Sequence, residues 1–196
     1  FFLTMERIQP KFQTLYDYDF DQTEDQIMIL LPVPVGFDTK TISIKFANSP
    51  DNQQLGLRIS IPNSEIPLVC GTLFAEVITE SMETSLDTTH PKGKYDSFYV
   101  IRMNKMSNNE WPTLILRKHP ITSEIDPKSS YLMYVITGLS DKPEDKQFAE
   151  EELAYAVTLG FPLAVRVYAD LLFEKGERDQ AIQLLRTMAD EYVDLD

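Results

Sequence analysis

Apolar residues between about residues 26 and 77 recur at every second position, which predicts β-strands with one buried face. In the clearest case, Ile42, Ile44 and Phe46 alternate with polar residues. We expect strands at 26–31, 41–47, 55–61, 68–78, 98–103 and 111–116. Turn-forming residues separate these segments at short intervals, and no helical period lies between them. The pattern therefore predicts an antiparallel β-sandwich.

Prolines, asparagines and polar runs indicate where these strands end. Pro32 and Pro34 lack the backbone N–H that a ladder needs, so we expect them to end the first strand. The polar segment 80–96 is predicted to be a long loop. The sequence Ser107-Asn108-Asn109 is expected to join the last two strands as a hairpin, because asparagine tolerates positive φ angles.

Beyond His119-Pro120 the apolar period becomes helical. Segment 131–139 fits a short helix or a strand, and helix is favoured because Asp126-Pro127 supplies a start and Gly138 a stop. Three further helices are predicted within 141–196, with Gly160 and Gly176 as C-terminal caps of the first two. We interpret Glu150, Glu151 and Glu152 as a first helical turn favoured by the helix dipole, with a role in recognition as the alternative.

The predicted organisation is mainly β with an α-helical C-terminal segment. We expect a lead at 1–13, a sandwich of about seven strands at 14–120, a linker or extension at 121–140, and an acidic helical hairpin or three-helix tail at 141–196. The last range holds 6 basic and 14 acidic residues, so it is chemically distinct from the rest.

Composition excludes several classes of function. The 196 residues carry 18 basic and 31 acidic side chains, a net charge of −13, so nucleic acid is a poor partner. No apolar run approaches the length of a membrane helix, and the residues after Phe1 lack the features of a secretory signal, so neither membrane insertion nor export is expected. Cys70 is the single cysteine and cannot form an intramolecular disulfide, which favours a reducing, cytoplasmic compartment.

Candidate catalytic residues are few, and we expect no enzyme activity and no cofactor. His90 lies in the polar loop, His119 lies beside a proline, and Cys70 lies in a predicted strand where a free cysteine behaves as a small apolar residue. Metal-ligand spacing, a glycine-rich phosphate loop and a serine elbow are all missing. Carboxylates near the start are read as a solvated acidic lead rather than an acid–base pair: Asp17, Asp19, Asp21, Glu24 and Asp25.

Trp111, the only tryptophan, is the strongest candidate for a binding contact, with core packing as the alternative. Basic residues lie close to it in sequence, and they form either a positive patch or the solvated faces of strands. The predicted partner-binding residues are Trp111, Pro112, Arg102, Lys105, Arg117 and Lys118. In the tail, Phe161, Tyr168 and Phe173 are read as core residues, with a peptide groove as the alternative.

Four short motifs carry a family resemblance. Tyr16 is followed by Asp21-Gln22-Thr23-Glu24-Asp25-Gln26-Ile27, and three later motifs are Gly71-Thr72-Leu73-Phe74-Ala75, Trp111-Pro112-Thr113-Leu114-Ile115 and Ile125-Asp126-Pro127. Their order resembles the CS domain in its NudC-like branch, over roughly residues 14–130. Tyr18 or Phe20 stands where that branch has a tryptophan.

The resemblance implies a CS-type sandwich that acts as a non-enzymatic co-chaperone or scaffold for client folding or stability. The implied partners are the ninety-kilodalton heat-shock chaperone and dynein-linked or β-propeller clients. Two features depart from the family: segment 80–96 lacks a tryptophan, and no long N-terminal coiled coil precedes the sandwich. Partner specificity and dimerisation through such a coil are therefore not carried over.

Residues 160–185 are similar to one unit of a tetratricopeptide-like or Sel-like helical repeat. Ala164, Ala169 and Ala181 would let paired helices approach closely, and Gly176 would turn the chain between them. One unit buries little apolar surface alone, so we expect it to dock on the sandwich or on a partner. The alternative to a co-chaperone is a structural subunit of a larger assembly, in which the sandwich and the acidic helices serve only as docking surfaces.

Overall fold

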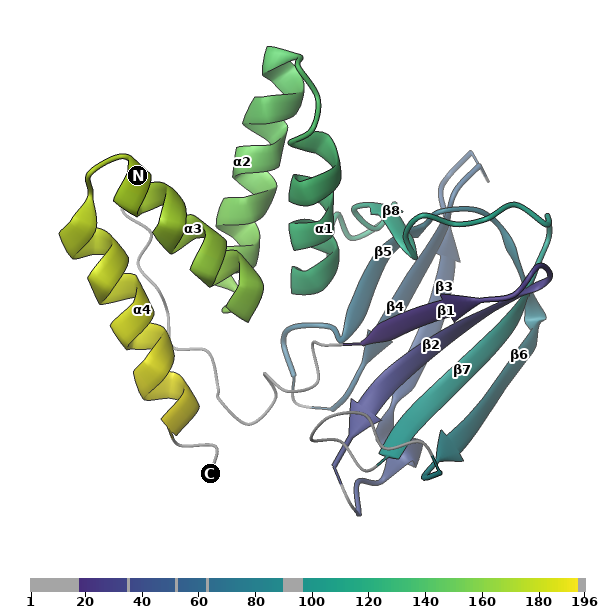
Figure 1. Cartoon of the computed structure of the whole chain (residues 1–196). Coiled ribbons are helices and arrows are strands. Elements are labelled where there is room, and N and C mark those ends of the chain that lie inside the picture. The colour runs from purple at the N-terminus through teal and green to yellow at the C-terminus, as the bar shows by residue number, and fades with distance from the viewer. Residues whose placement is uncertain (1–17, 35, 52, 63, 90–96, 194–196) are drawn as a thin grey trace. The chain divides into compact units, whose positions relative to one another are not determined.

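The computed structural model describes residues 18–34, 36–51, 53–62, 64–89 and 97–193 (Figure 1). The predicted lead at 1–13, Tyr16 and His90 lie outside the described residues. The described chain forms two units: a β-rich unit that ends at Ser129, and a helical unit that begins at Ser130. Each unit is described below by itself.

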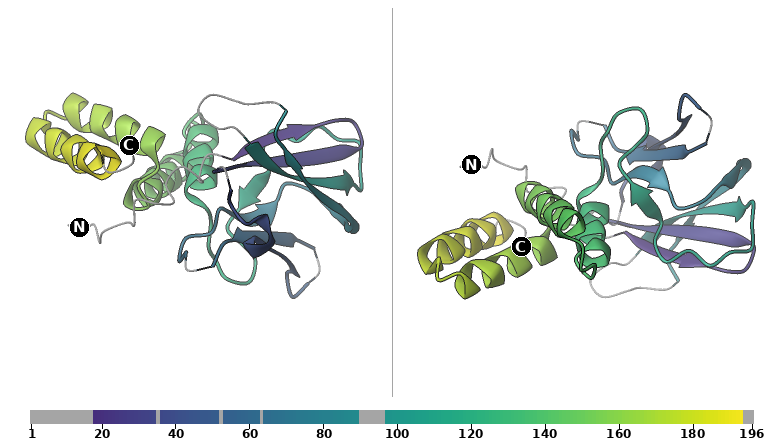
Figure 2. Two further views of the ribbon diagram at one scale, coloured as in Figure 1. Left: turned by 90° about the horizontal axis from the view of Figure 1, so that it is seen from below. Right: turned by 90° about the horizontal axis from the view of Figure 1, so that it is seen from above.

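The β-rich unit consists of two antiparallel sheets of four strands, which form two layers in the views of Figure 2. The first sheet has the order β1-β2-β7-β6 and contains β1 (Asp19–Gln22), β2 (Gln26–Val33), β7 (Ser97–Lys105) and β6 (Val77–Asp87). The second has the order β3-β4-β5-β8 and contains β3 (Ser43–Asn48), β4 (Leu55–Ser60), β5 (Val69–Leu73) and β8 (Ile115–Arg117). A 3-10 turn at Thr39–Thr41 precedes β3. The predicted antiparallel sandwich is confirmed.

Alternating apolar residues fill the space between the sheets, as the two-residue period predicts. On β2, Ile27 and Ile29 are fully buried and lie opposite Met103 and Ile101 of β7. On β4, Ile59 is likewise fully buried. Burying side chains of this size stabilises the fold by about 1.5–3 kcal/mol each.

The segment predicted as one strand at 68–78 is two strands that belong to different sheets. β5 ends at Leu73 and pairs with β4, whereas β6 begins at Val77 and pairs with β7. The prediction was wrong because β5 ends and β6 begins with apolar residues, so the sequence looks like one continuous strand. A two-residue period shows which face of a strand is buried, but it does not show that the chain has moved to the other sheet. β6 also continues to Asp87, so residues 80–87 are not part of a loop. Their polarity fits a strand at the edge of a sheet, where few side chains are buried.

The hairpin predicted at 98–116 does not form. β7 pairs with β2 and β6, whereas β8 pairs with β5 in the other sheet. Residues 106–114 therefore cross from one layer to the other, rather than making a tight turn. Asparagine-rich turns favour hairpins but do not determine the partner of the next strand, because that choice depends on tertiary packing.

Two smaller corrections concern the first strands. β2 continues through Pro32 to Val33, although Pro32 was expected to end it. Because β1 pairs only with Ile27 to Leu30, β2 has a single neighbour at Pro32, and the missing N–H costs no second ladder bond. Part of the predicted acidic lead, Asp19–Gln22, is strand β1.

Four helices follow the sandwich, and they confirm the helical periods of the sequence. They are α1 (Pro127–Thr137), α2 (Pro143–Thr158), α3 (Pro162–Glu174) and α4 (Arg178–Val193). Gly160 and Gly176 have φ angles of 72° and 80° after α2 and α3, the left-handed conformation in which glycine ends a helix most readily.

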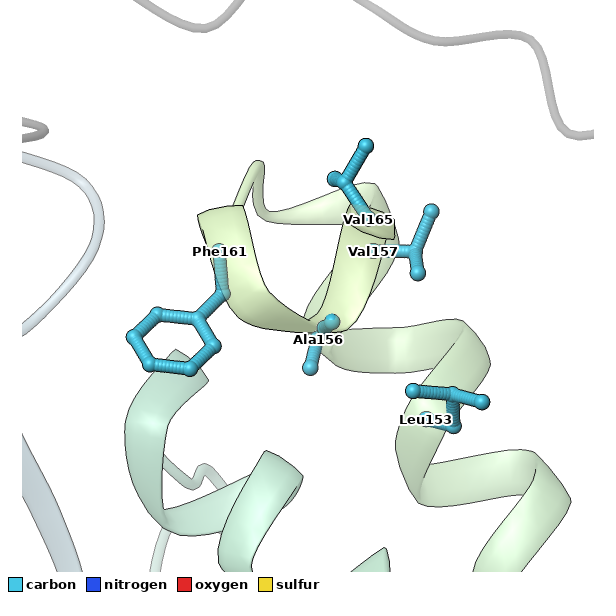
Figure 3. Packing of buried hydrophobic residues seen from close by; sticks show 6 residues of the cluster. Leu153, Ala156, Val157, Phe161 and Val165 are labelled. Carbon is cyan, nitrogen blue, oxygen red and sulfur yellow. The ribbon is translucent and has the colours of Figure 1, made fainter. Parts of the chain in front are cut away.

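A core of small and branched side chains holds α2 and α3 together (Figure 3). Leu153, Ala156 and Val157 of α2 pack with Phe161 and Val165. The ring of Tyr131, on α1, lies 5.4 Å from that of Phe161, measured between centroids. Phe161 is thus a core residue, as the first interpretation predicted.

The acidic run at 150–152 lies in the middle of α2, so its interpretation as a first turn was wrong. The first turn carries Glu144 and Asp145 instead. Glu152 is 1% exposed, and its carboxylate accepts a hydrogen bond of 2.6 Å from the Ser130 hydroxyl. Three consecutive acids could not reveal this, since helix geometry turns each of them to a different side.

One buried carboxylate joins both sheets to the start of α1. Asp126 accepts hydrogen bonds from the backbone N–H of Cys70 on β5 at 2.9 Å and from the N–H and hydroxyl of Ser129 at 2.8 and 2.7 Å. The Ser129 hydroxyl is used as a donor to Asp126, so the Tyr18 hydroxyl at 2.8 Å donates to it. Tyr18 directly precedes β1, which belongs to the other sheet. We call these four residues the Asp126 clasp.

Replacing Asp126 by Asn should destabilise the chain most strongly at acidic pH. Burial raises the Asp126 pKa from 3.8 to about 6. Between pH 3.8 and about pH 6 the native state therefore binds more protons than the unfolded state, so the free energy of unfolding falls as the pH rises through this range. Asn does not titrate, and its side-chain N–H₂ group, itself a donor, would face the donor groups of Cys70 and Ser129. The difference in unfolding free energy between wild type and Asp126→Asn should shrink by about 1–2 kcal/mol from pH 5 to 7.5. Urea unfolding followed by Trp111 fluorescence measures it.

Asp51→Asn is the matched control. The Asp51 carboxylate is exposed, and its hydrogen bond from the Ser49 hydroxyl lowers its pKa. Its stabilising effect is therefore lost as pH falls, so the difference from wild type should not shrink with rising pH. A pH-independent difference for Asp126→Asn would contradict the role of the clasp.

Candidate functional site

Trp111, the leading binding candidate, is a core residue in this structure. Its side chain is 2% exposed and lies between two aromatic rings, with centroid distances of 6.3 Å to Phe20 and 5.9 Å to Phe74. Within the described part of the chain, the indole Nε1 has no hydrogen-bond partner. The core alternative therefore describes Trp111, and its ring offers no free surface to a partner.

The Gln22 side chain holds the backbone of Trp111 in place. Its Nε2 donates to the Trp111 carbonyl at 2.8 Å, and its Oε1 accepts from the Trp111 N–H at 2.9 Å. An amide side chain thus pairs with Trp111 as a neighbouring strand would. This gives a physical role to the Gln-Thr pair that opens the resemblance, because it fixes the crossing segment after β7 to the end of β1.

Lys105 lies at the same junction, with its side chain buried. Its ammonium donates to the carbonyls of Thr23 and Asn109, each at 2.9 Å. These bonds satisfy a charge that would otherwise be costly to bury. As placed, Lys105 supports the junction from inside and adds little positive potential to the surface.

The other basic candidates lie on both sheets. Arg102 is on β7 and donates to the Ser85 hydroxyl of β6 at 2.9 Å. Arg117 ends β8, and Lys118 follows it; both are exposed, as is Pro112. The predicted hairpin would have placed all of them on one ribbon. Instead, Arg102 belongs to one sheet, while Arg117 ends a strand of the other and Lys118 follows it.

The remaining reactive candidates have structural environments. Burial raises the pKa of the Cys70 thiol to about 12, so it is protonated at neutral pH and is a poor nucleophile. The His119 ring is 5% exposed, and its Nδ1 accepts from the N–H groups of Ile121 and Thr122 at 3.4 and 3.3 Å. Burial lowers the His119 pKa, which favours the neutral ring that can accept these bonds.

In the ranges that the structure describes, no cluster of three or more His, Cys, Asp or Glu side chains is arranged to hold a metal ion. None of the described helices is both long and apolar enough to span a bilayer.

An open cleft of about 310 Å³ lies between the edges of the two sheets, and sequence reasoning missed it. The end of β3 and the start of β4 form one wall, and the start of β6 forms the other. Its apolar lining includes Phe46, Leu55, Val77 and Met106, and Glu76 is the one ionisable residue among the lining side chains. These residues come from four separate parts of the sequence, so no local pattern could reveal the cleft.

Comparison with known families finds a match in the first part of the sandwich. The sequence model of the CS domain matches residues 16–90. The nuclear movement protein nudc of Schizosaccharomyces pombe is 24% identical over 139 residues, which cover 70% of this chain and 72% of that protein. This alignment is longer than the CS match and so extends beyond it.

Solved structures give weaker matches. The nuclear movement protein from E. cuniculi is 19% identical, with a TM-score of 0.36, and the match covers 50% of this chain and 98% of that one. The CS domain of the human KIAA1068 protein is 19% identical, with a TM-score of 0.37, and the match covers 58% and 84%. Residues 16–90 of this chain thus match the CS domain, and the chain is similar to a nuclear movement protein of the nudc type.

Proposed function

We propose that this chain is a NudC-like co-chaperone or scaffold, a non-enzymatic protein-interaction module that assists the folding or stability of client proteins. The observation that carries the proposal is the CS domain at 16–90, together with the longer similarity to a nuclear movement protein. The Cys70 thiol is protonated, and the His119 ring accepts a hydrogen bond from the backbone of Ile121. Both environments favour a protein-binding function over a catalytic one. The proposed site of action is the cytoplasm.

The proposed partners are proteins: the ninety-kilodalton heat-shock chaperone and dynein-linked or β-propeller clients. The exposed residues Pro112, Arg117 and Lys118 form the proposed contact, with Arg102 as a further cation on the other sheet. Trp111 and Lys105 support this contact without touching the partner, because their hydrogen bonds fix the crossing segment that carries Pro112. Cations in a chain of net charge −13 would orient a partner with an acidic surface.

The helical unit is proposed as a second contact surface built like one tetratricopeptide-like or Sel-like repeat. Its support is local: Ala164, Ala169 and Ala181 are fully buried, which fits helices that pack closely, and Gly176 turns the chain between α3 and α4. The range 141–196 holds 14 acidic and 6 basic residues, so a basic partner surface would suit its net negative charge.

A double charge reversal, Arg117→Glu with Lys118→Glu, should weaken client protection by the full chain. The two acidic side chains would repel the acidic partner surface that Arg117 and Lys118 attract. At an exposed contact this should lower the affinity for the partner about threefold to tenfold. The measurement is light scattering of a heat-labile model enzyme with and without the chain, together with calorimetric titration of the purified heat-shock chaperone.

Lys40→Glu is the matched control, because Lys40 is exposed on the turn before β3 and lies outside the proposed contact. Equal protection by the double variant and wild type would remove the basic contact from the proposal. No protection by the wild-type chain would overturn the co-chaperone function and leave the assembly-subunit alternative.

Trp111→Ala should unfold or strongly destabilise the sandwich rather than test binding. Removing a buried indole from between Phe20 and Phe74 leaves a cavity and costs about 3–5 kcal/mol. Urea unfolding followed by far-ultraviolet circular dichroism measures the loss. Pro112→Ala, at the exposed neighbouring position, should change stability by less than about 1 kcal/mol, and a stable Trp111→Ala protein would contradict the core role of the ring.

A further inference from the structure

The cleft between the sheets is bordered by two strands that each lack a neighbour on one side. Within the described residues, β3 pairs only with β4 and β6 only with β7. Unpaired edges present backbone N–H and C=O groups to which another extended chain can add. The cleft thus combines an apolar hollow with free backbone hydrogen-bonding groups.

A backbone hydrogen bond fixes each wall of the cleft. On one wall, the N–H of Ser49 donates to the carbonyl of Gln54 at 2.8 Å, which closes the turn between β3 and β4. On the other, the N–H of Met106 donates to the carbonyl of Glu76 at 3.1 Å, which fixes the crossing between β5 and β6 to the end of β7. A cleft with such fixed walls is preformed, so binding there has a small ordering cost.

The two edges differ in how well they can receive a strand. The register of β6 with β7 shifts between Ile78 and Glu83, and such a bulge interrupts a ladder. The register of β3 with β4 is regular from Ser43 to Asn48. The open side of β3 is therefore the better template, and its inward-facing Phe46 borders the hollow.

The lining chemistry defines what fits. Phe46, Leu55, Val77 and Met106 offer contacts to a large apolar side chain, and Met106 is 62% exposed, which leaves its flexible thioether free to adjust. Glu76 is exposed at the rim, and none of the described residues that line the cleft is a lysine, arginine or histidine. A cation two positions from the apolar residue, on the same face of an extended segment, would complement the Glu76 carboxylate.

We propose that this cleft docks an extended segment of a partner protein, which pairs with β3, places one large apolar side chain in the hollow and sets a lysine or arginine against Glu76. The inference deepens the proposed function, on which it rests, by naming the partner segment that the CS domain receives. It also assigns to the open edge of β3 a role distinct from that of the basic contact.

The test uses the full chain labelled with ¹⁵N and the acetylated, amidated peptide Thr-Lys-Thr-Leu-Thr-Val-Thr, in which Lys and Leu are two positions apart and so share one face of an extended strand. Titration should move the amide signals of Phe46, Ala47 and Met106, and Glu76→Lys should weaken binding about threefold to tenfold. A peptide with Glu in place of its Lys should show the reverse preference, binding Glu76→Lys more tightly than wild type. A peptide with Pro in place of its Leu should bind neither, because it lacks a ladder donor and the apolar anchor.

Glu65→Lys is the matched control, since Glu65 is exposed and does not line the cleft. Trp111 fluorescence checks that each variant is folded. Signal changes confined to other surfaces, or equal affinity for both peptides in wild type and Glu76→Lys, would overturn the inference. Client protection by the same proteins separates the two levels: intact protection with no peptide binding refutes the cleft alone, whereas no protection by wild type refutes the proposed function.

Discussion

The clasp formed by Asp126 is the constraint on which the β-rich unit depends. One carboxylate receives the N–H of Cys70 from β5 and caps the first turn of α1 through the N–H of Ser129. Through the Ser129 hydroxyl it also reaches Tyr18, at the entry to β1. Two sheets that share no backbone ladder are therefore linked by one buried group. Such a group is costly unless every oxygen is paired, and here three donors pair it.

A second polar junction lies where the chain leaves β7, and it determines what the predicted binding residues do. Gln22 pairs with the backbone of Trp111, and the Lys105 ammonium bonds to two carbonyls beside it. Residues that suggest a binding surface in sequence thus hold the crossing between layers. Of the basic set, Arg117 at the end of β8 and the following Lys118 are exposed, and Arg102 on the other sheet is half-buried.

These junctions explain how a sandwich with mostly short strands can offer interaction surfaces. The strands bury their apolar faces inward, while the crossings between sheets create features that no strand has alone. The cleft bordered by Phe46 and Glu76 is one of them, since its walls belong to different sheets. Edges and crossings are places where a sandwich can bind a partner, because backbone groups stay unpaired there and loops can vary without loss of the core.

The sequence by itself determined the layers and the helices, because both follow from local periodicity and caps. Ile27, Ile29 and Ile59 are buried as their alternation predicts, and α1 begins after Asp126 and ends before Gly138 as expected. Tertiary structure alone decided which strands pair. β5 and β6 separate within one apolar run, and β7 and β8 do not form a hairpin, because pairing depends on contacts between distant residues. For the same reason, the buried role of Trp111 and the cleft beside Glu76 follow only from the folded chain.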